Sequence, residues 1–392
     1  MFVSFLYPFP LRGRQASYLW VAYKQITDLT PEDVCFIASP DYCIDPSIYA
    51  EAGRFECSWH RNDELGFVVP THEQLHRYVW HGVPECIYQR LKAVHRADSL
   101  IWLHLMQEED RELTDFLCET ITEIRRHRDV QGVLTWCNIL SVEKAGAQLN
   151  LPVMHFELGP LRDPWYRPLG YLDFQGVNGH TEAQQRYDAF LAEPNRPKPL
   201  NNDELLHLLK GPGYGDQTDN LGQYQVGIPL QVDDDSNLLA YNRGFTPALV
   251  LQYVQEQYAS DDILLRPHPA GQFGPPQELP VDRSSTSAAF VRRCQSIVTL
   301  NSSVAVEAML AGLPTTVLGE APSTIAAHTE IGQNSLASED ALDYLLLGYC
   351  VPYSYIFDVD YLSWRLQSPS ETAIRAAHLE TFAQAQSALH ES

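Results

Sequence analysis

A hydroxyl-rich turn between an apolar strand and an amphipathic helix is the strongest chemical signal in this sequence. Residues 300–314 read LNSSVAVEAMLAGLP, so Asn301, Ser302 and Ser303 follow directly after the strand. Serine hydroxyls, together with the unpaired backbone N–H groups at the positive end of a helix dipole, can cradle an anion. Glu307 lies one turn further along the helix, within reach of a sugar hydroxyl.

A second polar loop follows another short apolar run. Residues 263–265 lead into Arg266-Pro267-His268-Pro269, where the prolines restrict the backbone. Open α/β sheets bind ligands at the carboxyl ends of their strands, which places Arg266 and His268 beside the serine turn. Each motif alone has a commoner explanation, an ordinary helix N-cap for the serines and a rigid, solvated turn for the histidine. Together, the two motifs predict a nucleotide-phosphate site.

The combination of RPHP and NSSVAVEAMLAGLPTTVLG resembles the capsule-polysaccharide β-Kdo transferases, retaining glycosyltransferases that take the acid sugar Kdo from CMP-Kdo. The resemblance covers roughly residues 130 to 320, and residues 1–100 resemble no family by motif. It implies two substrates, CMP-β-Kdo and a saccharide acceptor that can be lipid-linked, in capsule or O-antigen synthesis. It implies no cofactor and no metal. The donor contacts that it implies are Arg266, Gln231, Ser236, Asn301, Ser302, Ser303 and Glu307.

Glu157 ends the strand expected at 152–156 and precedes Leu158-Gly159-Pro160. This position places its carboxylate at the carboxyl edge of the first sheet, although an exposed loop glutamate explains the residues equally well. The segment FELG at 156–159 matches a Glu-x-Gly turn of the β-Kdo transferases. The resemblance therefore implies that Glu157 is the base for the acceptor hydroxyl.

Three adjacent carboxylates, Asp233-Asp234-Asp235, follow the apolar run at 226–232. They could form a solvated turn, or a metal-binding Asp-x-Asp as in glycosyltransferases of the A type. The resembled family has Pro-Leu-Gln, a hydrophobic residue, two variable residues and then Asp-Ser, which makes Asp235 and Ser236 the functional pair. Retention requires a covalent intermediate or attack from the same face.

The resemblance therefore implies that Asp235 is the nucleophile and that His268 helps to neutralise the phosphate of the leaving cytidylate. The loop at 171–179, which reads YLDFQGVNG, also resembles a family loop. Its Asp173 and Asn178 would shape the cleft or contact the acceptor.

The composition limits the classes of partner. A chain of 392 residues with 45% hydrophobic residues can build two cores, and a formal charge of −23 argues against nucleic acid as a ligand. The eight cysteines contain no Cys-x-x-Cys pair and indicate free thiols in a reducing cytoplasm. No apolar run approaches the length of about twenty residues that a membrane span needs. The sequence predicts a cytoplasmic protein, brought to the inner face of the membrane by partner domains if its acceptor is lipid-linked.

Strands and helices alternate along the chain, which predicts parallel sheets. In the first half, we expect strands at 34–38, 99–105, 132–137 and 152–156, and helices at 85–97, 112–128 and 141–149. In the second half, we expect strands at 223–232, 263–265, 296–300 and 315–318, helices at 247–258, 288–294 and 370–389, and a helix that starts at Ser302 and Ser303 and ends at the Gly-x-Pro of 312–314. Since no Gly-x-Gly-x-x-Gly follows these strands, a dinucleotide cofactor is not indicated.

A stretch rich in proline and glycine at 191–220 predicts a linker. The expected fold is α/β with two Rossmann-like domains and an interdomain cleft, the glycosyltransferase B architecture. We expect an acceptor domain at 1–195, a CMP-Kdo domain at 220–368, and a C-terminal helix at 369–392 that packs back on the first domain.

Two other functions fit the same residues. A polyol-phosphate transferase of the teichoic-acid type uses CDP-linked donors and carries a similar Arg-x-His-Pro and Ser-Ser pairing. Because that reaction is attack on phosphorus, Asp235 would be dispensable. A catalytically inactive glycan-binding domain would bind ligand without releasing CMP.

Overall fold

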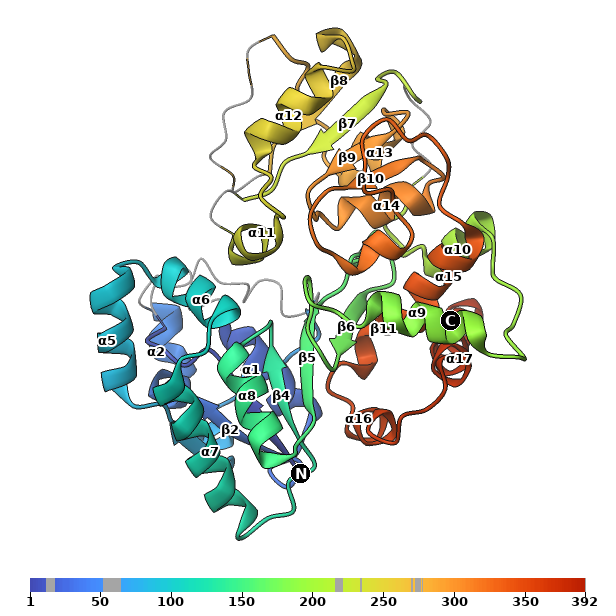
Figure 1. Ribbon diagram of the computed structural model, residues 1–392. Helices are drawn as coiled ribbons and strands as arrows, with labels where there is room; N and C mark the ends of the chain where they lie inside the picture. The colour runs from blue at the N-terminus through green and yellow to red at the C-terminus, as the bar shows by residue number, and fades with distance from the viewer. Residues whose placement is uncertain are drawn as a thin grey trace. The chain divides into compact units, whose positions relative to one another are not determined.

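The computed structural model describes residues 1–11, 18–51, 65–215, 221–232, 235–268, 271, 276 and 278–391. The chain forms two compact units (Figure 1). Unit 1 consists of Met1–Glu157, Asp173–Gln175 and Ser354–Ser368, and unit 2 of Leu158–Leu172, Gly176–Tyr353 and Pro369–Ser392. The predicted ranges 1–195, 220–368 and 369–392 divide the chain differently, because residues 158–172 and 176–195 belong to unit 2.

Unit 1 is built on a parallel sheet with the strand order β5-β4-β1-β2-β3. Its strands are β1 (Phe2–Phe5), β2 (Val34–Ala38), β3 (Trp80–Gly82), β4 (Gly132–Trp136) and β5 (Val153–Leu158). All residues of β1, β2 and β4 are buried, as expected for parallel strands that are covered on both faces. The carboxyl ends of these strands therefore share one edge of the sheet.

The helices of unit 1 follow from apolar residues spaced three or four apart. They are α1 (Leu19–Asp28), α2 (Pro46–Glu51), α4 (His72–Leu75), α5 (Glu85–His95), α6 (Asp98–Gln107), α7 (Arg111–Arg125), α8 (Leu140–Leu149) and α16 (Val359–Arg365). Helix α7 buries Leu113, Leu117, Ile121 and Ile124 and packs against α8. The Asp110 side chain caps its start by accepting a hydrogen bond from the Leu113 N–H at 3.0 Å.

One expectation for the first half is wrong, and one strand was missed. Residues 99–105 were expected as a strand, but they lie within helix α6, which buries Ile101, Trp102, Leu105 and Met106 along one face. A short apolar run cannot distinguish a buried helix from a strand, and here the four-residue spacing decides. Strand β1 was not predicted, because its four residues are too few to show a period, yet it pairs with β2 on one side and β4 on the other.

Unit 2 contains a second parallel sheet, with the order β10-β9-β7-β8. Its strands are β7 (Val226–Pro229), β8 (Ile263–Arg266), β9 (Ile297–Thr299) and β10 (Thr315–Val317). The helices of this part are α11 (Ser236–Tyr241), α12 (Pro247–Gln255), α13 (Ser287–Arg292) and α14 (Val304–Leu310). Two units with parallel sheets and intervening helices confirm the predicted α/β class with Rossmann-like domains.

The expected linker contains a regular helix. Helix α10 (Asn202–Leu209) begins with a capping box, in which Asn201 and Glu204 each accept a hydrogen bond from the other's backbone N–H, and it packs against α14. Its buried leucines make this stretch part of the core of unit 2. The proline and glycine content predicted the flanking turns and missed the helix between them.

The C-terminal helix α17 (Glu371–Glu391) packs within unit 2. Arg375 forms a buried ion pair with Asp343 (2.6 Å), and the backbone carbonyl of Phe382 accepts a hydrogen bond from Arg167. Arg167 lies in the range predicted for the first domain, but it belongs to unit 2. The C-terminal segment that joins unit 1 is instead Ser354–Ser368, which carries α16. Among the described helices, none is both long and apolar enough to cross a membrane.

Candidate functional site

The parallel sheet of unit 2 gathers the predicted donor-binding residues from three loops. Gln231 follows β7, His268 follows β8 and Asn301 follows β9. Strand β7 pairs in parallel with both β8 and β9, so the three loops leave the same edge of the sheet. This edge is where open α/β sheets bind their ligands.

Gln231 and Asn301 are joined across this edge. The Gln231 side-chain Nε2 donates to Asn301 Oδ1 at 2.8 Å, and the Asn301 backbone N–H donates to Gln231 Oε1 at 3.4 Å. Among the described residues, the Asn301 Nδ2 group is buried and has no hydrogen-bond partner. An unsatisfied buried donor costs about 1–3 kcal/mol, which an acceptor atom of a ligand would recover.

Asp235 is the N-cap of helix α11. Its Oδ1 accepts hydrogen bonds from the backbone N–H groups of Asn237 (2.8 Å) and Leu238 (3.2 Å), and the residue is exposed. Within the described part of the chain, neither bond uses Oδ2, so the cap orients the carboxylate and leaves one oxygen for chemistry. Asp233 and Asp234 lie outside the described residues, as does the side chain of Ser236.

His268 lies close enough to Asp235 and Arg266 for their charges to act on it. Partial burial lowers the pKa of the His268 imidazole, Asp235 opposes this shift and Arg266 adds to it. The ring is therefore neutral at pH 7. A neutral imidazole can donate one hydrogen bond to a phosphate oxygen, and it becomes a better donor as negative charge develops there.

The two serines begin helix α14 in different ways. The hydroxyl oxygen of Ser302 accepts a hydrogen bond from the Val304 N–H at 3.3 Å, whereas the side chain of Ser303 makes no capping bond and the residue is exposed. Ser302 thus serves partly as an ordinary cap, and Ser303 presents its hydroxyl at the helix start.

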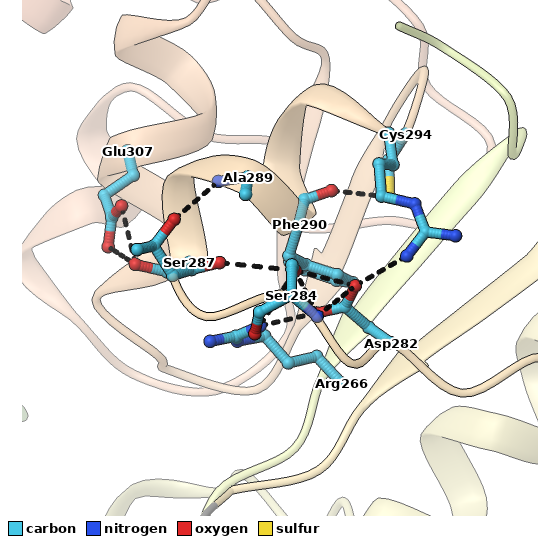
Figure 2. A network of polar contacts seen from close by, with 10 residues as sticks. Arg266, Asp282, Ser284, Ser287, Ala289, Phe290, Cys294 and Glu307 are labelled. Atoms are coloured by element: carbon cyan, nitrogen blue, oxygen red, sulfur yellow. Dashed lines mark hydrogen bonds and ion pairs between the residues drawn. The ribbon is translucent and has the colours of Figure 1, made fainter. Parts of the chain in front are cut away.

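Arg266 is held in a partly buried ionic network (Figure 2). Its guanidinium donates to Asp282 Oδ2 at 2.5 Å, and Arg293 donates to the other oxygen of Asp282 at 2.8 Å. The Asp282 side chain is 0% exposed and also accepts from the Ser284 hydroxyl at 2.6 and 2.7 Å. Two guanidinium groups share one carboxylate, so the network keeps a net positive charge behind the predicted phosphate site.

Glu307 is buried, contrary to the simple picture of a side chain exposed to a ribose. Both of its oxygens lie 2.8 Å from the Ser287 hydroxyl, which donates from the start of α13 (Figure 2). Burial raises the pKa of Glu307 to about 7, and Ser287, Arg266 and Arg162 limit the rise. Near pH 7, the carboxyl group can therefore either donate or accept a hydrogen bond.

This raised pKa predicts a pH-dependent stability. Because the folded protein keeps a proton on Glu307 that the unfolded chain loses near pH 4.5, stability falls as the pH rises from about 4.5 to about 7. The loss is about 3 kcal/mol. In urea unfolding at pH 5 and pH 8, E307Q should therefore gain stability relative to the wild type at the higher pH. E278Q, at an exposed position, is the control. If E307Q and the wild type differ in free energy of unfolding by the same amount at both pH values, the raised pKa of Glu307 is refuted.

In unit 1, Glu157 lies at the end of β5 and accepts a hydrogen bond from the Cys137 thiol. The distance from Sγ to Oε2 is 3.2 Å. Cys137 follows β4 with φ of 67°, in the left-handed region that non-glycine residues rarely adopt. The predicted base therefore has a partner in the residue that follows the neighbouring strand, which the sequence did not indicate.

The other two predicted cleft residues have different surroundings. Asp173 is fully buried in unit 1, and its Oδ1 accepts a hydrogen bond from the Gln175 N–H at 2.8 Å. Asn178 belongs to unit 2, has φ of 65°, and has a buried Nδ2 group that lacks a hydrogen-bond partner among the described residues. The adjacent Gly179 packs so closely on the ring of Tyr241 that a Cβ atom there would lie 2.1 Å from it. The loop is thus fitted against helix α11.

Several residues that act on predicted site residues of their own unit carried no sequence motif. They are Cys137, Arg162, Asn237, Asp282, Ser284 and Ser287. Asn237 has a buried Oδ1 atom without a partner in the described structure, beside the cap of Asp235. These residues approach the site through tertiary contacts, and an isolated serine or aspartate in a loop gives no signal in one sequence.

One family model points to a glycosyltransferase. Residues 4–182 match the model of the glycosyltransferase 99 family N-terminal domain, so the match includes residues 4–100, for which the motifs showed no resemblance. No curated protein matches this chain. The family match supports glycosyltransferase activity.

Similar solved structures include two of KpsC from Thermosulfurimonas dismutans. The β-Kdo 2,7 transferase is 20% identical, with 62% of this chain and 89% of that chain covered and a TM-score of 0.45. The β-Kdo 2,4 transferase is 13% identical, with 56% and 81% covered and a TM-score of 0.37. The spinosyn rhamnosyltransferase SpnG, in complex with spinosyn aglycone, is 12% identical, with 98% and 96% covered and a TM-score of 0.32.

Proposed function

We propose that this chain is a retaining glycosyltransferase that moves β-Kdo from CMP-β-Kdo to a saccharide hydroxyl in the synthesis of a bacterial surface polysaccharide. The main support for the proposal is that Gln231, His268 and Asn301 follow three neighbouring parallel strands, at one edge of the unit 2 sheet. Asp235 stands close enough to His268 to change its titration. The proposed nucleophile and the proposed phosphate-binding group therefore lie within the range of each other's charge.

The donor in this proposal is an anion, and the chain carries a formal charge of −23. Binding must therefore depend on local positive groups and hydrogen-bond donors. The Arg266–Asp282–Arg293 network supplies a net positive charge, and His268, Ser303 and the Asn301 Nδ2 group supply donors. These groups can neutralise the cytidylate as it leaves, without a metal ion.

The two carboxylates take separate steps in the proposed reaction. Asp235 attacks the anomeric carbon of Kdo as CMP leaves, which forms a glycosyl ester and inverts the configuration once. Glu157 then takes the proton of the acceptor hydroxyl while that oxygen attacks the same carbon and releases Asp235. The second inversion restores the β configuration.

The test is a CMP-release assay with CMP-Kdo generated in situ and a panel of saccharide acceptors. We expect acceptor-dependent CMP release, and a product whose Kdo is β-linked by NMR. The same assay with CDP-glycerol and CDP-ribitol as donors is the comparison. Release of CMP from a CDP-polyol, or ligand binding without any release, would contradict the proposed reaction.

A further inference from the structure

A chain of polar contacts runs along the carboxyl edge of the unit 1 sheet and ends at Glu157. The Cys137 thiol donates to Glu157 Oε2 at 3.2 Å, and the Cys137 backbone N–H donates to the Phe156 carbonyl oxygen at 3.0 Å. The Cys137 carbonyl oxygen lies 3.2 Å from His155 Nδ1. Cys137 therefore contacts the β5 strand at three points: through its thiol, its backbone N–H group and its carbonyl oxygen.

His155 holds this turn from inside the core. Its ring is fully buried, and burial lowers the pKa of the imidazole, so the ring is neutral. Because a carbonyl oxygen can only accept, Nδ1 carries the proton and donates it to Cys137. Nε2 is then an acceptor, and among the described residues it has no hydrogen-bond partner. The fold tolerates this unsatisfied nitrogen, which is destabilising, while keeping Nδ1 on the Cys137 carbonyl.

The backbone of Cys137 adds a second cost. A non-glycine residue in the left-handed region is less stable than in the right-handed region, and glycine would avoid this penalty. The fold therefore keeps a residue with a side chain at a position where the backbone conformation favours glycine. Strained residues of this kind are often found where a group must be held in a particular orientation.

We propose that Cys137 and His155 are positioning residues for Glu157. The Cys137 thiol orients the Glu157 carboxylate toward the acceptor hydroxyl, and His155 fixes the left-handed turn that presents the thiol. The inference rests on the proposed role of Glu157 as the base, and it names residues that neither bind the donor nor touch the reacting atoms. It predicts a defect confined to the acceptor half of the reaction.

The test compares C137A, C137S and C137G with the wild type. We expect C137A and C137G to lower kcat for transfer by about ten- to a hundredfold, the scale of a misplacement of about 1 Å. The KM for CMP-Kdo and the inhibition constant of CMP should stay within about twofold of the wild-type values, because other residues form the proposed donor site. C137S keeps a hydroxyl donor and should recover most of the activity.

The stability of the same variants separates positioning from a structural role. C137G relieves the left-handed strain, so its Tm should equal or exceed that of C137A while its transfer rate is equally low. H155N retains an amide donor near the position of Nδ1 and should keep more activity than H155L. The matched control is C86A, since the exposed Cys86 thiol also faces a carboxylate, at 3.7 Å from Glu112 Oε1.

The outcomes distinguish this inference from the function on which it rests. A wild-type protein that does not release CMP from CMP-Kdo would refute the proposed function and the inference together. An active wild type with an equally active C137A would overturn the inference alone. The inference would also be overturned if the transfer activities of the variants followed their Tm values and C137S were as impaired as C137A.

Discussion

Replacing Asp235 by asparagine should lower β-Kdo transfer by at least about a thousandfold, because an amide cannot serve as the carboxylate nucleophile. Asparagine caps a helix about as well as aspartate, so the hydrogen bonds to Asn237 and Leu238 at the start of α11 should remain. The measurement is kcat for CMP release with acceptor present, beside the Kd for CMP. We expect a large fall in kcat and a similar Kd.

The structure supplies two comparisons for this variant. D235A loses the cap as well, at a cost of about 0.5–2 kcal/mol, so its Tm should fall below that of D235N although both are inactive. Asp358 is another aspartate N-cap, at the start of α16, and its side chain accepts a hydrogen bond from the Tyr361 N–H at 2.7 Å. The D358N variant should be fully active. Near-normal activity of D235N would favour attack on phosphorus, as in the polyol-phosphate transferases.

Glu157→Gln should reduce transfer to the acceptor by about 10²- to 10⁴-fold while the first step with the donor continues. The glutamine carbonyl can still accept a hydrogen bond from the Cys137 thiol, so the side chain should keep its place and lose only the ability to take a proton. Rapid-quench kinetics should show a burst of CMP, of about one equivalent per enzyme, that does not depend on acceptor.

A matched control comes from another glutamate that faces a thiol. E112Q alters the exposed partner of Cys86 and should behave as the wild type in both steps. If E157Q loses the CMP burst together with transfer, Glu157 acts in the donor step and the division of roles between the two carboxylates is wrong.

Much of the scaffold could be predicted because its signals are local. The strand at 34–38 is confirmed, and the helices expected near 85, 112 and 141 are confirmed with small shifts of their ends. Apolar periodicity and caps depend on residues that are near in sequence. The parallel pairing of β7 with β8 and β9 then follows from the alternation of elements, and with it the common edge of Gln231, His268 and Asn301.

The surroundings of the site residues could not be predicted, because their partners are distant in sequence. Asp282 binds Arg266, and Ser287 binds Glu307. Both approach the site only when the chain returns along β8 into α13. Burial raises the pKa of Glu307, and burial follows from tertiary packing. The sequence therefore suggested a ribose contact but not a carboxyl group that titrates near neutral pH.

The most direct test of the proposed mechanism is intact-protein mass spectrometry of E157Q after incubation with CMP-Kdo in the absence of acceptor. The mechanism predicts a protein whose mass is increased by one Kdo residue, and peptide sequencing should locate the adduct at Asp235. D235N and the double variant D235N/E157Q should show no increase. An unmodified E157Q protein that nevertheless releases CMP, or an adduct on a residue other than Asp235, would contradict the mechanism.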